Sequence, residues 1–233
     1  VFMKKMLFIY NPKAGKAQIR NKLADILDVF TRGGYEITVY PTQKSEDAME
    51  KTRTRSRDYD IVVCSGGDGT LDEVVTGMIH SGFRTPIGYI PAGSTNDFAN
   101  SLHLSKNIVK AARDIVQGNP VAFDIGSFNG RGFSYVASFG AFTKASYATP
   151  QNVKNALGHL AYILEGINTI SSIRAEHMVI EADGMSYEDD YIFGAISNST
   201  SIAGILTLKP ELVDMSDGLF EMLLIKAPRD LIE

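Results

Sequence analysis

Apolar and polar positions follow two different rhythms along this chain, and the change falls near its middle. In the first half, short apolar runs alternate with longer segments whose apolar residues return every three or four positions. A short apolar run bounded by Gly, Pro or Asn is typical of a buried strand, and the second spacing is typical of an amphipathic helix. The pattern predicts strands over residues 6–10, 36–40, 61–64 and 86–90, and helices over residues 19–30, 45–57 and 71–81.

After Pro120 the segments become shorter and are separated by turn residues. Residues 121–127 and 132–138 flank Asn129-Gly130, a dipeptide that strongly favours a tight hairpin. Further strands are predicted around residues 178–182, 191–197 and 220–225, together with one helix that carries Leu157, Leu160, Leu164 and Ile167 in register. Repeated strand–helix units imply a mostly parallel sheet covered on both faces, and the second half indicates antiparallel β structure. We therefore predict an α/β domain over residues 1–128 and a β domain over residues 129–233.

Composition narrows the class of protein. The 233-residue chain has a net charge of −4, whereas nucleic-acid binding usually needs a basic surface, so we expect no nucleic-acid partner. The single cysteine, Cys64, excludes a disulfide within the chain and lies in an apolar run, so we predict a core residue. The sequence shows neither a signal peptide nor an apolar run of the roughly 18 residues that span a membrane. We expect a cytoplasmic protein with at most peripheral membrane contact.

The strongest chemical signal is Ser65-Gly66-Gly67-Asp68-Gly69-Thr70, which lies between a predicted buried strand and a predicted helix. Glycines allow backbone N–H groups to approach an anion, and a helix N-terminus adds partial positive charge. Asp68 would repel a phosphate unless a cation stood between them. The turn therefore predicts a nucleotide-phosphate site that works with Mg²⁺; a plain tight turn is the alternative.

Three aspartates occupy comparable places. Asp68 and Asp97 follow the third and fourth predicted strands, and Asp124 lies in the segment that leads out of the first domain. In an open parallel sheet, ligands bind beyond the carboxyl ends of the strands, so Asp68 and Asp97 should face one site that Asp124 closes. The alternatives are that Asp97 caps the short helix after it and that Asp124 is a turn residue.

The loop Asn11-Pro12-Lys13-Ala14-Gly15 ends the first predicted strand and should lie at the same edge of the sheet. Lys13 is a candidate cation for phosphate, or else a solvated surface residue, and Thr42 is a weaker candidate from its position after the second strand. The four histidines show no metal-ligand spacing, and neither a Gly-x-x-x-x-Gly-Lys phosphate loop nor a Gly-x-Ser-x-Gly elbow is present in the sequence.

A basic run, Lys51, Arg53, Arg55 and Arg57, lies in the predicted helix over residues 45–57. It is consistent with a solvated helix surface or with a landing patch for anionic lipid, whose binding would weaken with salt.

Taken together, Asn11-Pro12-Lys13-Ala14-Gly15, Gly66-Gly67-Asp68-Gly69-Thr70-Leu71-Asp72-Glu73 and Gly93-Ser94-Thr95-Asn96-Asp97-Phe98-Ala99 resemble the soluble bacterial diacylglycerol kinase family of lipid kinases. The resemblance extends to Asp124-Ile125-Gly126 and to Asp214-Met215-Ser216-Asp217-Gly218-Leu219. It implies a Rossmann-like nucleotide domain followed by a β-sandwich domain, here incomplete, with ATP-dependent phosphorylation of a lipid hydroxyl.

The resemblance also assigns residues. It implies ATP contacts from Asn11, Pro12, Lys13, Ala14, Gly15, Thr42, Gly66, Gly67, Asp68, Gly69, Thr70, Leu71, Asp72 and Ser94. It implies a network of Asp68, Asp97 and Asp124 with water and Mg²⁺, and a second, structural Mg²⁺ at Asp214, Asp217 and Leu219. Ser94 takes the place of a threonine and Asp72 that of an asparagine. The family's proposed base, a glutamate in an Asp-Gly-Glu turn, has no match up to Glu233, so we expect nucleotide binding but poor turnover from these residues alone.

The predicted function is therefore transfer of the γ-phosphoryl group of ATP to a lipid, with diacylglycerol as the expected substrate at the inner membrane face. A kinase for a sphingoid base, ceramide, polyprenol or NAD and a non-catalytic nucleotide- or lipid-binding regulator are the alternatives. A dehydrogenase is disfavoured because no Gly-x-Gly-x-x-Gly turn follows the first strand. The sequence leaves open whether two copies form a homodimer.

Overall fold

The computed structural model describes residues 3–140, 174–202, 206–207, 209, 211 and 213–227. The chain divides into two compact units, one formed by Val1–Tyr135 with Met215–Gly218 and the other by Val136–Asp214 with Leu219–Glu233. The predicted helix through Leu157 and Ile167 and the terminal Glu233 lie outside the described residues.

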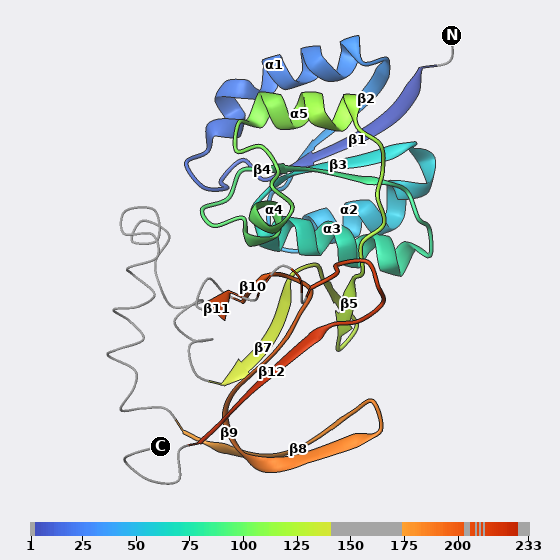
Figure 1. Ribbon diagram of the computed structural model, residues 1–233. Helices are drawn as coiled ribbons and strands as arrows, with labels where there is room; N and C mark the ends of the chain where they lie inside the picture. The colour runs from blue at the N-terminus through green and yellow to red at the C-terminus, as the bar shows by residue number, and fades with distance from the viewer. Residues whose placement is uncertain are drawn as a thin grey trace. The chain divides into compact units, whose positions relative to one another are not determined.

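A sheet of four parallel strands forms the centre of the first unit (Figure 1). Its order is β2-β1-β3-β4, with β1 at Lys4–Tyr10, β2 at Tyr35–Pro41, β3 at Ile61–Gly66 and β4 at Ile87–Pro91. The two central strands are buried over most of their length, as expected for a parallel sheet that is covered on both faces. The four predicted strands are confirmed, each within two residues at either end.

Helices cover both faces of this sheet. The helix α1 spans Gln18–Arg32, α2 spans Asp47–Arg55, α3 spans Asp68–Ser81, α4 spans Asp97–Ser101 and α5 spans Ile108–Gln117. A 3₁₀ turn, η1, at Ser56–Asp58 follows α2. In Figure 1, α1 and α5 lie on one face of the sheet, and α2 and α3 lie on the other.

Each face is closed by a different kind of packing. Under α1 and α5 the core contains several large side chains, among them Phe8, Ile26 and Phe30, and these three are fully buried. On the other face, α2 and α3 approach closely: a Cβ added to Gly77 would lie 2.3 Å from the Met49 carbonyl oxygen. A glycine is required there because any side chain would push α2 away from α3.

A small hairpin completes the first unit. The strands β5, Gly126–Phe128, and β6, Arg131–Phe133, pair antiparallel. The turn residues Asn129 and Gly130 have φ angles of 49° and 78°, the left-handed geometry that a two-residue hairpin needs. The hairpin predicted from Asn129-Gly130 is thus confirmed.

The second unit is antiparallel. Its main sheet has the order β12-β9-β7, with β8 also paired to β9. These strands are β7 at Val136–Gly140, β8 at Glu176–Ala182, β9 at Met185–Ser197 and β12 at Glu221–Lys226. A separate pair, β10 at Ser201–Ile202 and β11 at Leu206–Thr207, is also antiparallel. The fold class, a Rossmann-like α/β sheet followed by an antiparallel sheet, is confirmed.

Two local predictions were wrong, and one helix was missed. The strand expected over residues 121–127 is irregular up to Ile125, because residues 121–125 pair with no neighbouring strand in the described part of the chain. Accordingly, Val121 is 71 % exposed. The strand expected over residues 132–138 breaks into β6 and β7, because the Ser134 N–H donates to the Asp72 side chain instead of to a strand. The helix α5 was missed.

Among the described residues, no helix is long and apolar enough to cross a membrane.

Candidate active site

The order of the strands creates a switch point between β1 and β3. The chain leaves β1 toward α1 on one face of the sheet and leaves β3 toward α3 on the other (Figure 1). The carboxyl ends of the two strands lie side by side, since the Asn11 N–H donates to the Ser65 carbonyl at 2.9 Å. Open α/β sheets bind ligands at this position, because diverging loops leave room there.

Three loops meet at this edge, residues 11–15 after β1, residues 66–68 after β3 and residues 92–96 after β4; we call them the loop cluster. A Cβ built on Gly93 would lie 2.5 Å from the Gly67 Cα, so the second and third loops touch backbone to backbone. Gly15, with φ +50°, has room for no side chain, because a Cβ would meet the Ala92 carbonyl oxygen at 2.4 Å. Glycines in the three loops therefore allow the loop backbones to approach one another closely.

The helix α3 begins at this cluster, as the glycine turn predicted, although it starts at Asp68 and not at Leu71. Its N-cap residue is Gly67, which has no side chain with which to cap the helix. The backbone N–H groups of a first turn lack intrahelical acceptors and carry the positive end of the helix dipole. The oxygens of a phosphate could accept hydrogen bonds from these N–H groups at the start of α3, a helix of 14 residues.

Asp68 is half-buried at the start of α3 and reaches the next loop. Its two carboxylate oxygens accept hydrogen bonds from the N–H groups of Asp97 and Phe98, at 3.1 and 3.3 Å. Burial raises the pKa of Asp68, and these backbone hydrogen bonds oppose the rise. Asp68 therefore caps α4 from a distance of about thirty positions in the sequence. The alternative that Asp97 caps α4 is wrong, because the N-cap is Asn96 and Asp97 is the first residue of the helix.

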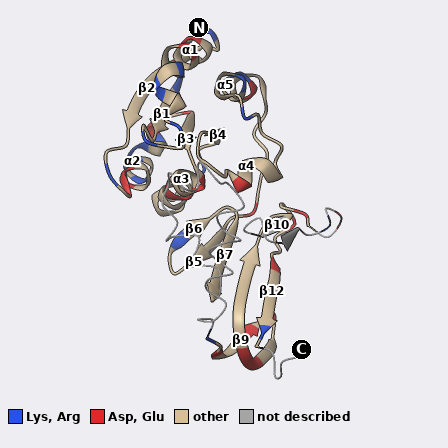
Figure 2. Cartoon of the chain, turned by 90° about the vertical axis from the view of Figure 1, so that its left-hand side faces the viewer, with Lys and Arg blue, Asp and Glu red and all other residues tan. Residues whose placement is uncertain are grey.

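Asp72 lies one turn further along α3. Its Oδ1 accepts hydrogen bonds from the Ser134 N–H at 3.1 Å and the Ser134 hydroxyl at 2.8 Å. Burial raises the pKa of Asp72 to about 6, with a smaller contribution from the nearby charge of Asp68. Acidic residues on α3 and α4 thus gather beside the loop cluster (Figure 2), an arrangement that favours a counter-cation.

Phe98, which follows Asp97, is in contact with Phe123, which precedes Asp124. The rings of Phe98 and Phe123 pack edge to face with centroids 6.1 Å apart. Asp124 also binds the segment Met215–Gly218: its N–H donates to the Met215 carbonyl at 2.9 Å, and its Oδ2 accepts from the Gly218 N–H at 2.6 Å. The structure thus joins the Asp97 N–H to the Asp68 carboxylate, and it places Phe123, the residue before Asp124, against Phe98, the residue after Asp97.

The remaining candidates surround the cluster in different ways. Asn11 folds its own loop, since its Oδ1 accepts from the Lys13 N–H at 2.9 Å, and the Lys13 side chain is exposed. The Thr42 N–H donates to the Tyr10 carbonyl at 2.9 Å, which holds the end of β2 beside the end of β1. Ser94 is exposed, whereas Leu71 is buried.

The residues predicted to hold a structural metal include one member of the segment Met215–Gly218 that Asp124 binds. Asp217 belongs to this segment, and Asp214 and Leu219 precede and follow it in the chain. Within the ranges that the structure describes, no group of three or more His, Cys, Asp or Glu side chains is arranged to hold a metal ion. The assignment of Asp214, Asp217 and Leu219 to Mg²⁺ stays a prediction.

Part of the basic run, which lies in α2 and η1, is paired with two acidic residues. Arg53 pairs with Glu50 at 2.8 Å, and Arg55 and Arg57 pair with Asp58 at 3.2 and 3.7 Å. Lys51 lies over the ring of Tyr40, 4.1 Å from its centroid. These contacts favour the solvated helix surface over a lipid landing patch.

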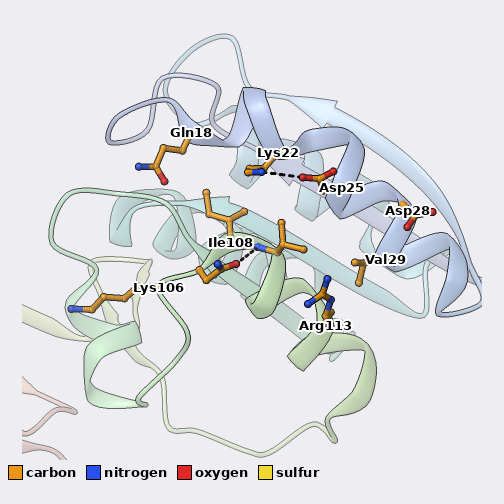
Figure 3. A pocket seen from close by; sticks show the side chains of 10 residues that line it. Gln18, Lys22, Asp25, Asp28, Val29, Lys106, Ile108 and Arg113 are labelled. Atoms are coloured by element: carbon orange, nitrogen blue, oxygen red, sulfur yellow. Dashed lines mark hydrogen bonds and ion pairs between the residues drawn. The ribbon is translucent and has the colours of Figure 1, made fainter.

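A hollow of about 790 Å³ lies elsewhere, between α1 and α5 (Figure 3). Its charged residues are of both signs, with Lys22 paired to Asp25 at 3.2 Å and Arg113 on the opposite helix. None of the predicted site residues lines it. The chemistry of the candidate site therefore belongs to the loop cluster and not to this hollow.

The comparison with protein families agrees with this location. The sequence model of the diacylglycerol kinase catalytic domain matches residues 5–128, which contain all three loops and α3. This match covers more than half of the chain.

The chain belongs to the diacylglycerol kinase family. Among curated relatives, it is 35 % identical over 224 residues to the diacylglycerol kinase of Staphylococcus aureus (strain MRSA252), covering 96 % of this chain and 71 % of that protein. It is 34 % identical over 226 residues to the diacylglycerol kinase of Bacillus subtilis (strain 168), covering 96 % and 74 %.

The fold of this family member agrees with that of a solved relative. A crystal structure of a diacylglycerol kinase from Bacillus anthracis str. Sterne superposes with a TM-score of 0.78 at 26 % identity, covering 97 % of this chain and 75 % of that one. The resemblance inferred from the motifs is thereby confirmed, and the chain is a kinase with ATP as its co-substrate.

Sequence reasoning gave no role to three residues of this family member that the structure places beside the glycine loops. Ser134 binds Asp72, and Tyr89 and Asn96 bind the backbone of Gly66 and Gly93. A signal for Asn96 was available, because asparagine adopts the left-handed conformation more readily than other residues with a side chain. Neither Tyr89 nor Ser134 carried a local signal, since their partners are distant in the sequence.

Proposed function

We propose that the chain transfers the γ-phosphoryl group of ATP to the hydroxyl of a membrane lipid, with diacylglycerol as the substrate and phosphatidic acid as the product. The observation that carries the proposal is the meeting of three glycine loops and the start of α3 at the β1/β3 switch point. The names of the relatives supply the substrate class. Because such a lipid resides in a bilayer, we infer peripheral contact with the membrane.

The phosphates of ATP would bind at the loop cluster. The backbone N–H groups of Gly67, Asp68 and Gly69 open α3 and are suited to phosphate oxygens. Lys13 would add a mobile positive charge, while Asn11, Thr42 and Ser94 would offer polar groups from the neighbouring loops. The adenosine part of ATP would lie along the residues that come after β1 and β2. These roles follow from the family motifs and from the position of the loops.

The residues present fit a magnesium ion that is shared with ATP. Burial raises the pKa values of Asp68 and Asp72, which marks negative charge without a full counter-charge. Mg²⁺ takes one or two carboxylates and completes its shell with phosphate oxygens and water, so a cluster of three protein ligands is not needed. Asp68, Asp97 and Asp124 would hold it, and when bound it would neutralise charge on the phosphates.

The protein would accelerate phosphoryl transfer mainly by positioning. Rigid N–H donors at the start of α3 hold the phosphate chain, and the exclusion of water strengthens these contacts. The lipid hydroxyl must also lose a proton, which needs a base within hydrogen-bond reach. The resemblance assigns this role to a glutamate in an Asp-Gly-Glu turn, and no such turn occurs among residues 1–233.

Two measurements test the proposal. Titration of the chain with Mg·ATP should give heat and thermal protection, and lipid vesicles that contain diacylglycerol should yield labelled phosphatidic acid from labelled ATP. Parallel incubations with sphingoid base, ceramide and polyprenol distinguish the other lipid kinases. If Mg·ATP binds but neither this chain nor the matching span of a relative forms labelled product, a non-catalytic regulator would be favoured. Absence of Mg·ATP binding would refute the proposal.

A further inference from the structure

Tyr89 and Asn96 form a polar brace between the second and third loops of the cluster. Tyr89 lies on β4 and is 7 % exposed. Its hydroxyl donates to the Gly66 carbonyl at 3.2 Å, and the Asn96 Oδ1 lies 3.4 Å away as a second acceptor. Burial is the main cause that raises the pKa of Tyr89, so the hydroxyl stays protonated and can donate.

Asn96 closes the third loop on itself. Its Oδ1 accepts from the Gly93 N–H at 2.9 Å, and its Nδ2 donates to the Gly93 carbonyl at 2.9 Å. This reciprocal pair fixes which end of the amide carries the oxygen. The residue has φ 54° and ψ 53°, a left-handed conformation that asparagine tolerates. Asn96 thus holds Gly93 by both of its backbone polar groups.

The third loop is hydrogen-bonded to one carbonyl group of the second loop, that of Gly66. The Gly66 oxygen accepts from the Ala92 N–H at 2.8 Å and from the Gly93 N–H at 3.1 Å, in addition to the Tyr89 hydroxyl. These three hydrogen bonds hold the carbonyl toward β4 and the loop that follows it. The contact between Gly67 and Gly93 follows from the same arrangement, since a Cβ on Gly93 would lie 2.5 Å from the Gly67 Cα.

We propose that Tyr89 and Asn96 are positioning residues for the phosphates of ATP: together they lock the Gly66–Gly67 turn against Gly93 and so aim the first N–H groups of α3. The proposal rests on the proposed function, because it needs ATP to bind at the loop cluster. Neither side chain has to touch the nucleotide. Their effect should grow with the number of phosphates, because the brace acts on the glycine loops and not on an adenosine pocket.

The test measures the dissociation constants of Mg·ATP, Mg·ADP and AMP by calorimetry for the wild-type chain and two variants. Tyr89→Phe keeps the buried ring and removes only the hydroxyl. Asn96→Gly keeps the left-handed backbone accessible and removes the amide. Each should raise the Kd of Mg·ATP about tenfold, the equivalent of one or two lost hydrogen bonds. The Kd of AMP should change less than about twofold.

Matched controls are present in the chain. Tyr59→Phe removes a tyrosine hydroxyl near η1, and Asn129→Gly removes a left-handed asparagine side chain from the β5–β6 turn. Both controls should bind Mg·ATP like the wild type.

The outcomes separate the two proposals. A wild-type chain that does not bind Mg·ATP refutes the proposed function itself. A wild-type chain that binds Mg·ATP, with Tyr89→Phe equal to it, overturns the brace even if Asn96→Gly fails to fold. Equal losses for AMP and ATP would also overturn it, since they would indicate a general structural defect instead of positioned phosphates.

Discussion

Asp72 on α3 accepts two hydrogen bonds from Ser134, one from its N–H at 3.1 Å and one from its hydroxyl at 2.8 Å. Four residues further along the helix, the Thr76 hydroxyl contacts both polar backbone groups of Gly132, at 3.0 and 3.3 Å. After four more, the His80 Nε2 lies 2.8 Å from the Gly130 carbonyl oxygen. Since positions four apart share a helix face, one polar stripe of α3 holds alternate residues of the hairpin.

The first prediction concerns the charge of Asp72. Its pKa is raised from 3.8 to about 6 by burial and by Asp68, so between these values the folded state binds a proton that the unfolded state releases. The free energy of unfolding must therefore fall as pH rises from about 4 to about 6, by up to about 2–3 kcal/mol at this one site. Asp72→Asn keeps an oxygen acceptor for Ser134 and should remove this pH-dependent loss.

Urea unfolding between pH 4 and pH 7 in metal-free buffer measures the effect. We expect Asp72→Asn to be more stable than the wild type at pH 7, by about 1 kcal/mol or more, with the difference disappearing near pH 4. Asp114→Asn, which alters an exposed ion pair with Lys110, serves as the control and should not change the slope. Parallel curves for wild type and Asp72→Asn would contradict the assigned pKa.

A second prediction distinguishes the roles of two carboxylates that lie on α3 and cap neighbouring helices. Asp68 binds the first N–H groups of α4, and Glu73 binds the N–H groups of Glu46 and Ala48 at the start of α2, at 2.9 and 3.2 Å. Replacing either by alanine should destabilise the chain by about 1 kcal/mol and speed hydrogen exchange at the helix that it caps. Only Asp68→Ala should also abolish phosphoryl transfer and weaken Mg·ATP binding, because only Asp68 lies in the loop cluster. Loss of nucleotide binding in Glu73→Ala would argue against that distinction.

A third prediction compares Gly69, in the first turn of α3, with Gly93 of the loop cluster. A Cβ on Gly69 would meet no atom within 4 Å, whereas a Cβ on Gly93 would lie 2.5 Å from the Gly67 Cα. Gly69→Ala should keep or raise the stability by up to about 1 kcal/mol, since alanine is the better helix former. It should nevertheless weaken Mg·ATP binding, because its methyl group enters the space where phosphate would lie. Gly93→Ala should lower the melting temperature as well. Unchanged nucleotide affinity in Gly69→Ala would exclude phosphate binding at the start of α3.

The fourth prediction uses Cys64. Burial raises the pKa of its thiol to about 12, and the side chain is fully buried in β3. The native protein should therefore not react with a thiol reagent at pH 8, because the thiolate is both scarce and inaccessible. Labelling should appear with the rate of unfolding in urea. Rapid modification of the native protein would mean that β3 is far less well packed than described.

The sequence was sufficient for the parallel sheet because its signals are local. The strands of the parallel sheet are continuous apolar runs, and the glycine turn before Leu71 marks the start of α3 to within a few residues. The helix α5 was missed even though Ile108, Ala111 and Ala112 are buried on one face of it. Ile115 and Val116 continue the same stripe against that core, so the helical spacing was present in the sequence and this local signal was overlooked.

The candidate site was predicted less completely, for a physical reason. The residue types at the ends of β1, β3 and β4 identified the loops, since glycine and aspartate at those places have few other uses. The contacts of Asp72 with Ser134 and of Tyr89 with Gly66 join positions 62 and 23 residues apart. Such pairs depend on tertiary packing, and no local pattern in one sequence specifies them.

The two caps supplied by α3 have a consequence for cooperativity. Asp68 and Glu73 anchor the first turns of α4 and α2 to a single helix, so neither of those short helices has an independent end. If α3 opens, both lose their anchors in the same event. The three helices should thus behave as one foldon, with amides that share a common opening free energy and that loosen together long before the sheet does.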